Sequence, residues 1–405
     1  MARLPFRTVV LSAALGVALA TQLSGCTAPQ QPPQPIVTAP PPSAVPLPAA
    51  PPIPQAAAPT PVQTVTNGRA KVALLVPLTG PNSTVGQAML DAANMALFDV
   101  STDIALLPRD TGGTPDGASA ATSRAVSDGA GLILGPVFAG EVGRVREQLN
   151  GSPVSAIVYS TDSSVAGGNV FVMGFLPALQ VDRVVGFAKS RGMTKLAALV
   201  PDNAYGVAVT AEIQALQGRL GLAPPRILKI SRDVKGELAT LADDPPQMLL
   251  VALGGEQLVN IAPAIGEFAQ AHPLQLLGTG LWADDPNLWQ VPALAGGWYA
   301  APEPGNFNQF ASRFQTTYNY KPPRIATLAY DSVALAASVS RGAAPTLSPF
   351  NRDVLLQANG FIGIDGGFRF LPTGLSERNL ALLALGPDGP TVVDPPPPNF
   401  QAIGQ

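Results

Sequence analysis

The sequence has almost none of the residues on which most catalytic and metal sites depend. Its 405 residues include one cysteine, Cys26, and one histidine, His272. A Ser–His–Asp triad and a zinc site each need a histidine or a cysteine among several cooperating groups. His272 stands alone at the end of an expected surface helix, next to Pro273. We therefore predict that the chain is not an enzyme and uses no metal and no cofactor.

Charge is also scarce. Charged residues make up 13% of the chain and the formal net charge is −3, which excludes a strongly basic nucleic-acid binder. The sequence has no G-x-S-x-G element, no phosphate-binding loop, no nicotinamide-binding fingerprint and no serine three residues before a lysine. Two pairs of adjacent acids, Asp243–Asp244 and Asp284–Asp285, lie beside prolines, where such pairs are usually solvated rather than catalytic. These absences favour a binding protein.

The N-terminus has the features of a cleavable export signal. Two arginines precede an apolar run over residues 9–19, which is too short to span a bilayer but suits the core of a signal peptide. The sequence LSGC at residues 23–26 resembles the lipobox of bacterial lipoproteins. This resemblance implies that residues 1–25 are removed and that Cys26 is the lipidation site. The alternative is a chance cysteine in a transmembrane anchor.

Residues 26–68 form a proline-rich segment. There are 14 prolines over residues 27–66 and no charged residue over residues 8–68. Because proline lacks an amide donor and fixes φ, we predict a disordered linker that reaches about 125 Å at roughly 3.1 Å per residue. The lipoprotein resemblance implies attachment to a membrane through the lipid. An aspartate after the lipidated cysteine commonly favours the inner membrane, so Thr27 favours the outer membrane, facing the periplasm.

From residue 69 to about residue 400, short apolar runs alternate with longer amphipathic ones, which indicates a parallel α/β architecture. The expected strands cover residues 72–76, 104–107, 132–134, 154–158, 196–200, 227–230, 248–253 and 274–277. The expected helices cover residues 85–98, 118–127, 141–150, 179–190, 206–220, 256–271, 307–318 and 325–340.

The length of this alternation favours two lobes. We predict lobe 1 over about 69–175 and 300–345, and lobe 2 over about 176–299 and 346–400. Crossings between the lobes are expected near residues 171–175 and 296–301, and a hairpin with a tight Asp365–Gly366 turn over residues 361–370. The expected fold is thus two Rossmann-like lobes joined by crossover segments.

The loops that follow the strands contain the site candidates, because open parallel sheets bind ligands beyond the carboxyl ends of their strands. The loop over residues 77–83 contains Thr79 and Gly80 and leads into a helix whose first amides favour an anion such as a carboxylate. Glycine, proline and hydroxyl residues also fill the loops at 135–136, 159–162, 201–206, 254–256 and 278–282. Six such loops support the fold more strongly than they support any one ligand.

The segment from about Arg69 to Phe400 resembles the leucine-binding-protein family, which has the type 1 periplasmic binding fold. The residues that carry this resemblance lie at positions 75–81, 135–136, 202, 205–206, 278–282 and 330–331. The sequences GGWYA at 296–300 and NGFIGIDG at 359–366 further resemble a branch of penicillin-binding-protein activators, which are lipoproteins that regulate peptidoglycan synthases.

Family members that bind amino acids hold the carboxylate with hydroxyls and amides after the third and fourth strands of the first lobe, and a tyrosine and an acid of the second lobe help to hold the rest. Carried over by position, the resemblance implies Ser160, Thr161 and Tyr205 as ligand-binding residues, with Glu256 or Asp284 facing an ammonium group. The loop after Pro136 reads VFAG, without the usual hydroxyl. This departure argues against amino-acid binding and leaves a different small ligand open.

Two functions remain. In the first, an outer-membrane lipoprotein reaches across the periplasm to activate a peptidoglycan synthase. In the second, a solute receptor delivers an amino-acid-like ligand to an ABC permease. The anchor and the long linker favour the first, because a receptor must meet its permease at the inner membrane.

Overall fold

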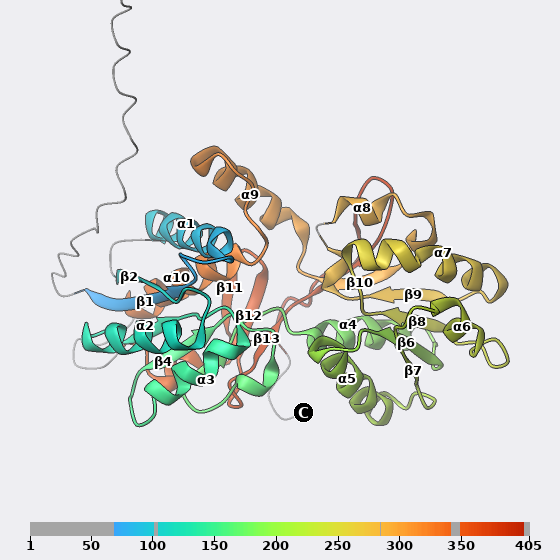
Figure 1. Cartoon of the computed structure of the whole chain (residues 1–405), viewed down its shortest axis with the longest axis horizontal. Coiled ribbons are helices and arrows are strands. Elements are labelled where there is room, and N and C mark those ends of the chain that lie inside the picture. Colours follow the sequence, from blue (N-terminus) through green and yellow to red (C-terminus); the bar gives the residue numbers. More distant parts are fainter. Residues whose placement is uncertain (1–68, 101–103, 284, 342–348, 401–405) are drawn as a thin grey trace, which may run out of the picture. The chain divides into compact units, whose positions relative to one another are not determined.

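The computed structural model describes residues 69–100, 104–283, 285–341 and 349–400 (Figure 1). The predicted signal peptide, Cys26 and the proline-rich linker lie outside the described residues, so they stay predictions. The described part contains a five-stranded sheet, a seven-stranded sheet and a small three-stranded sheet.

The five-stranded sheet forms the centre of the first lobe. Its strands are all parallel, in the order β2-β1-β3-β4-β5. They are β1 (Ala70–Val76), β2 (Ile104–Asp110), β3 (Leu132–Leu134), β4 (Ser155–Val158) and β5 (Val170–Val172). Residues 72–76 are fully buried, as expected for a strand that is covered on both faces.

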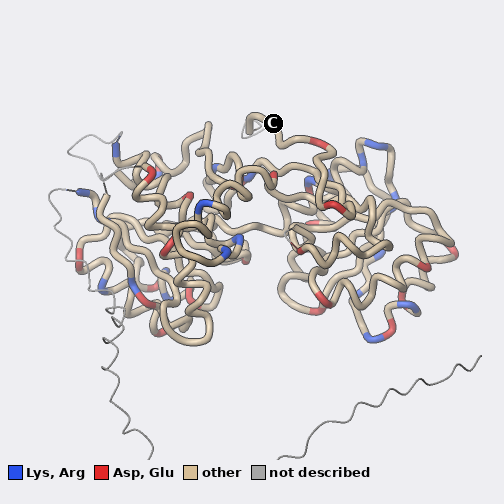
Figure 2. Tube along the Cα trace, turned by 90° about the horizontal axis from the view of Figure 1, so that it is seen from above, with Lys and Arg blue, Asp and Glu red and all other residues tan. Residues whose placement is uncertain are grey.

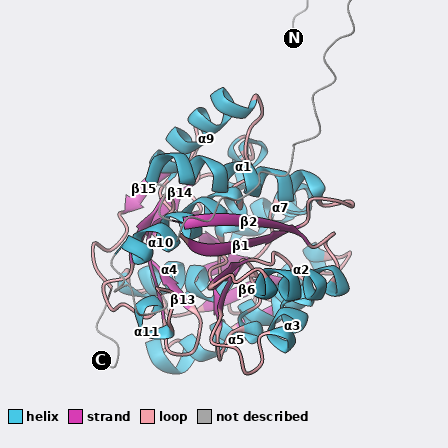
Figure 3. Ribbon diagram, turned by 90° about the vertical axis from the view of Figure 1, so that its left-hand side faces the viewer, coloured by secondary structure: helices cyan, strands magenta, loops and turns pink. Residues whose placement is uncertain are grey.

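Helices cover both faces of this sheet. One face packs against α1 (Ser83–Val100) and α10 (Ala326–Arg341), and the other against α2 (Pro115–Ser127) and α3 (Ala139–Gln148). Figure 3 shows β1 and β2 between α1 on one side and α2 on the other.

The seven-stranded sheet forms the centre of the second lobe, in the order β15-β14-β10-β9-β8-β6-β7. Its parallel strands are β6 (Leu196–Val200), β7 (Arg226–Lys229), β8 (Met248–Val251), β9 (Gln275–Gly278) and β10 (Trp298–Ala301). Two antiparallel strands, β14 (Ala381–Ala384) and β15 (Thr391–Asp394), complete it. One face packs on α4 (Pro177–Ser190) and α5 (Ala204–Leu220), and the other on α6 (Val234–Ala239), α7 (Gly255–Ala271) and α8 (Pro286–Trp289).

Local capping signals set several helix ends. The Thr114 side chain accepts from the Gly117 amide at the start of α2, whose first residue is a proline. Asn203 caps α5 in the same way, and α5 ends at Gly221 with φ 61°. Short 3₁₀ turns lie at Ser163–Val165, Gly280–Trp282 and Pro292–Leu294.

The predicted boundary of the second lobe is wrong over residues 349–378. This segment contains α11 (Arg352–Leu355) and the small sheet of β11 (Phe361–Gly363), β12 (Gly366–Phe370) and β13 (Ser376–Arg378). Its apolar side chains, such as Phe350 and Phe370, are buried in the core of the first lobe. Leu375 also forms a bridge with Val172 of β5. Beyond residue 378, the strands of this chain end belong to the second sheet.

All the expected strands and helices are present, with ends shifted by a few residues. The hairpin is confirmed, with β11 and β12 antiparallel, but its turn is Ile364–Asp365 rather than the expected Asp365–Gly366, because Gly366 already pairs with Gly363. The expected crossings at 171–175 and 296–301 are partly strands, because β5 and β10 lie there and the chain crosses only after them. Helix α9 (Pro304–Tyr318) follows β10 and packs with α1 and α10. Charged residues are sparse along the trace and both signs are mixed (Figure 2).

Candidate functional site

The strand order of each sheet marks one place where a ligand is expected. In the first sheet β1 lies between β2 and β3, so the order reverses direction between β1 and β3. In the second sheet the same reversal lies between β6 and β8. Open α/β sheets bind ligands in the crevice that forms at such a switch point, beyond the carboxyl ends of the strands.

In the first lobe, an internal carboxylate fills the expected anion position. Asp110, the last residue of β2, lies opposite the loop that follows β1. Its Oδ1 accepts from the amides of Leu78 (2.8 Å), Thr79 (3.2 Å) and Gly112 (2.8 Å), and its Oδ2 accepts from the Thr79 hydroxyl (2.7 Å). Burial by itself raises the pKa of Asp110, but these hydrogen bonds outweigh it and the pKa is lowered.

The structure therefore does not support the predicted role of Thr79 and Gly80 in binding a ligand anion. Both are exposed, but the Thr79 donors already point at Asp110. Gly80 has φ 80°, and a Cβ there would lie 3.2 Å from the Gly112 carbonyl oxygen, so its conformation favours glycine for the turn itself.

Ser160 and Thr161 follow β4, as predicted, but they differ from each other. Ser160 is almost fully buried, and its Oγ accepts from the Asp162 amide at 3.0 Å. Its carbonyl oxygen lies against Gly174, where a Cβ would come within 2.0 Å. Thr161 is exposed. Ser160 thus supports the local turn and the packing of residues 173–176.

The loop after β3 contains no hydroxyl, in agreement with the sequence. Phe138 precedes α3, and its amide donates to Oε2 of Glu141 at 3.1 Å. Glu141 is fully buried, and burial raises its pKa against the opposing effects of hydrogen bonds from Thr111 and Phe138. Like Asp110, Glu141 therefore accepts hydrogen bonds from its own lobe.

The second lobe has a hollow of about 390 Å³ at its switch point. It lies beyond the carboxyl ends of β6 and β8, with one further wall residue from the turn after β9. The lining residues are Pro201, Asn203, Tyr205, Ala252, Leu253, Gly254, Gly255, Gln257 and Leu281. This is the position that the strand order predicts.

Tyr205 is the predicted site residue that the structure places in this hollow. Its hydroxyl donates to Oγ1 of Thr279 at 2.8 Å, and Thr279 is fully buried at the end of β9. Burial raises the pKa of Tyr205 to about 12, while the bond to Thr279 opposes that rise. The phenol therefore stays protonated at neutral pH.

The start of α7 forms another wall of the hollow. Its N-cap is Gly254, which has no side-chain hydrogen bond to the helix. The first amides of a helix have no partner within the helix, and the positive end of the dipole lies there. Glu256 is exposed on the first turn and does not line the hollow, whereas its neighbour Gln257 does. Asp284 lies outside the described residues.

Sequence reasoning missed Asp110, Thr279 and Gln257. The sequence does not single out Asp110, because the expected strand ends at residue 107 and leaves this acid in a loop, whereas β2 extends to Asp110. Thr279 lies within the glycine-rich sequence GTGLW, whose glycines indicate only a tight backbone turn. Gln257 could be found from its place in the first turn of a helix, beside the acid that the resemblance implies.

Many residues that carry the family resemblance support the framework of the lobes. Trp282 is fully buried, and its Nε1 donates to the Leu253 carbonyl at 2.9 Å. Its ring packs near that of Tyr299, and Gly278 and Gly297 leave room for it. Asp331 and Asp365 are likewise buried.

Within the described ranges, no group of three His, Cys, Asp or Glu residues is placed to hold a metal ion. The same ranges contain no helix that is both long and apolar enough to cross a membrane.

Comparison with known proteins agrees with this architecture. The profile of the periplasmic binding protein family matches residues 69–382. An uncharacterised protein of Rickettsia prowazekii is 24% identical over 144 residues, which is 36% of this chain and 38% of that protein. The chain thus aligns with well under two thirds of this relative.

Solved structures match over far more of their length. A protein of Rhodospirillum rubrum that is assigned to a branched-chain amino acid ABC transporter has a TM-score of 0.71 at 18% identity, covering 80% of this chain and 100% of that one. A leucine-binding protein of Thermotoga maritima has a TM-score of 0.57 at 17% identity, covering 81% and 99%. A Brucella ovis protein that binds leucine, isoleucine, valine, threonine and alanine has a TM-score of 0.63 at 16% identity, covering 82% and 95%. At these identities the likeness establishes the type 1 periplasmic binding fold and no ligand.

Proposed function

Because this chain belongs to the periplasmic binding protein family, we propose that it is a non-enzymatic binding protein whose main role is to activate a peptidoglycan synthase. In this proposal the lipid on Cys26 anchors it to the outer membrane, facing the periplasm. The linker carries the folded part across the gap to its partner. The resemblance of residues 296–300 and 359–366 to penicillin-binding-protein activators supports this branch of the family.

One observation favours activation of a synthase over amino-acid transport. Asp110 occupies the amides of Leu78 and Thr79 and the Thr79 hydroxyl, which are donors of the anion position predicted in the loop after β1. A second carboxylate there has to displace Asp110 or lie beside its charge. The absence of a hydroxyl in the VFAG loop acts in the same direction.

The test is reconstitution with a purified peptidoglycan synthase and its lipid-linked precursor. The full chain is expected to increase the rate of glycan polymerisation or crosslinking. A chain without residues 32–61 is expected to do the same in solution, where no gap has to be crossed, but to fail in cells. Lack of stimulation in solution contradicts the proposal, and full activity of the shortened chain in cells contradicts the spanning role of the linker.

A solute receptor for an ABC permease is the second candidate. It is favoured by the hollow in the second lobe, where the start of α7 has no side-chain cap and Tyr205 lies close by. Proteins with this fold include the amino-acid-binding structures named above. Purification of the full chain without denaturation, followed by mass spectrometry of any released small molecule, tests this role independently of the synthase.

A further inference from the structure

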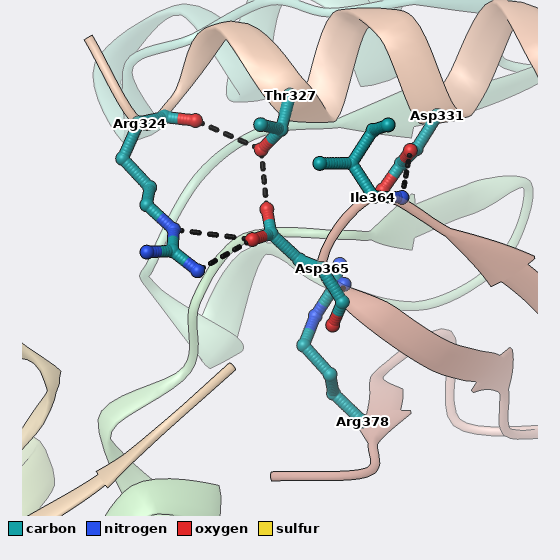
Figure 4. Close-up of polar contacts among 6 residues, drawn as sticks. All are labelled: Arg324, Thr327, Asp331, Ile364, Asp365 and Arg378. Atoms are coloured by element: carbon teal, nitrogen blue, oxygen red, sulfur yellow. Dashed lines mark hydrogen bonds and ion pairs between the residues drawn. The ribbon is translucent and has the colours of Figure 1, made fainter. Parts of the chain in front are cut away.

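Three buried charged side chains, Asp331, Asp365 and Arg378, and the half-buried Arg324 form a cluster in the first lobe, between α10 and the small sheet (Figure 4). Asp365, at the tip of the β11–β12 hairpin, is fully buried. Its Oδ1 accepts from Nε (3.1 Å) and Nη2 (2.7 Å) of Arg324, and its Oδ2 contacts the Thr327 hydroxyl. Its backbone carbonyl accepts from Nη1 of Arg378 at 3.2 Å.

Asp331 of α10 is the less satisfied acid of this cluster. Its Oδ1 accepts from the Ile364 amide at 2.7 Å, but its Oδ2 is buried with no hydrogen-bond partner among the described residues. A Cβ on Gly363 would lie 2.2 Å from that oxygen, so the hairpin backbone closes directly over the carboxyl group. Nε and Nη2 of Arg378 are also buried without a hydrogen-bond partner in the described part of the chain.

The cluster contacts side chains that lie in, or directly after, the three connections between the two large sheets. The Arg378 guanidinium lies 5.3 Å from the ring of Phe175, in the segment that joins β5 to α4. The Arg324 guanidinium lies 4.4 Å from the ring of Phe307, in the first turn of α9, which follows β10. Arg378 is itself the last residue of β13, directly before the segment that leads to β14.

We propose that this cluster stabilises the three connections in a charge-dependent way. The connections are held more firmly when Asp331 is protonated and open more readily when Asp331 is ionised. This inference goes beyond the proposed function and holds for either kind of partner. Ionisation places a second buried negative charge near Asp365, and the hairpin that seals Asp331 also supports Arg378. A change in charge at this point therefore acts on Asp365 and Arg378, and through Asp365 on Arg324, and the two guanidinium groups lie against the rings of Phe175 and Phe307.

The electrostatics places this change near neutral pH. Burial, and next the charge of Asp365, raises the pKa of Asp331 to about 7, although Arg378 and the amides of Ile364 and Asp365 oppose the shift. The other titratable groups near Asp331 are Tyr159, which follows β4, and Tyr330 on α10, and burial raises the pKa of both phenols further above 10. They stay neutral in this range. Because its pKa is raised, the ionised form of Asp331 is the one that the folded structure disfavours.

Hydrogen–deuterium exchange on the full chain tests the proposal, with rates corrected for the intrinsic effect of pH. The reporters are the amides of Met173 and Asn379, which donate to the carbonyls of Val158 and Gly367 beside the connections. Their protection is expected to fall by about threefold or more between about pH 5.5 and about pH 8.5. Val251, in the middle of the second sheet, serves as the reference amide and is expected to stay unchanged.

Asp331→Asn separates the proposal from a general effect of pH, because the amide keeps the shape and cannot ionise. In this variant the reporters are expected to stay protected across the whole range, while the exposed control Asp116→Asn follows the wild type. Asp365→Asn removes the neighbouring charge and is expected to move the midpoint to lower pH.

If Asp331→Asn does not fold, the pH dependence of amide protection in the wild-type chain is the test. A midpoint near pH 7 at the reporters but not at Val251 supports the proposal. Flat protection, or a pH response that persists in a folded Asp331→Asn chain, overturns it.

Discussion

The two lobes differ at the same structural position, which is the set of loops beyond the carboxyl ends of the parallel strands. Beyond the carboxyl ends of the first sheet, the amides after β1 are held by Asp110, a carboxylate of the chain itself. Beyond those of the second sheet, the amides that start α7 have no side-chain cap and border a hollow. The same fold can thus leave a binding position open in one lobe and close it in the other with one acidic side chain.

The largest effect is expected from Asp110→Ala, which removes the internal anion. Three amides and a hydroxyl lose a charged acceptor, and water replaces part of it because Asp110 is exposed. We expect a loss of about 2 kcal/mol in the free energy of unfolding, measured by chemical denaturation. If the first-lobe site is closed only by Asp110, sulfate should stabilise this variant more than the wild type. An equal effect of sulfate on both would contradict that reading.

The pH dependence of the same contact sharpens the comparison. Because hydrogen bonds lower the folded-state pKa of Asp110 below its ordinary value of 3.8, its stabilising effect is fully present above that value. It is lost as pH falls through the folded-state pKa. The stability difference between wild type and Asp110→Ala is therefore expected to be constant near neutral pH and to shrink below about pH 4. A difference that stays constant down to pH 2 would argue against a charged acceptor.

In the second lobe, Tyr205→Phe removes the hydroxyl that bonds to Thr279 and keeps the ring. We expect a loss of about 1 kcal/mol in stability, because a half-buried neutral hydrogen bond contributes about that much. Tyr318→Phe is the matched control in the first lobe, since the Tyr318 hydroxyl donates to the Asp91 carbonyl at 2.9 Å, away from the hollow. If Tyr205 forms part of a ligand site, its variant alone should weaken binding of a co-purified ligand. Equal weakening by both variants would remove Tyr205 from that site.

The smallest effect is expected from Glu256→Gln. The Glu256 side chain is exposed and does not line the hollow, so stability should change by less than about 0.5 kcal/mol. Gln257→Ala, one residue along, is expected to affect any ligand bound in the hollow. Ligand affinity that drops in the Glu256 variant and not in the Gln257 variant would show that the acid predicted from the sequence is the functional one.

Periodicity predicted the parallel strands and most helices because apolar runs such as residues 72–76 are buried on both faces whatever their surroundings. Periodicity did not predict which lobe residues 349–378 belong to, because the pattern of a hairpin does not indicate which of two apolar cores it packs against. The site was harder still. The sequence placed Tyr205 after a strand, but it could not show that Asp110 would satisfy the Thr79 donors, because this contact joins residues 31 apart in the chain.

Isothermal titration of leucine, isoleucine and valine into the full chain tests the central claim most directly, namely that the first lobe no longer offers a free anion position after β1 or a hydroxyl after β3. The account predicts no saturable heat for any of the three amino acids, since Asp110 occupies the donors after β1 and the loop after β3 has no hydroxyl. A one-to-one binding isotherm that disappears in both Tyr205→Ala and Ser160→Ala would contradict the account and make solute capture the leading function.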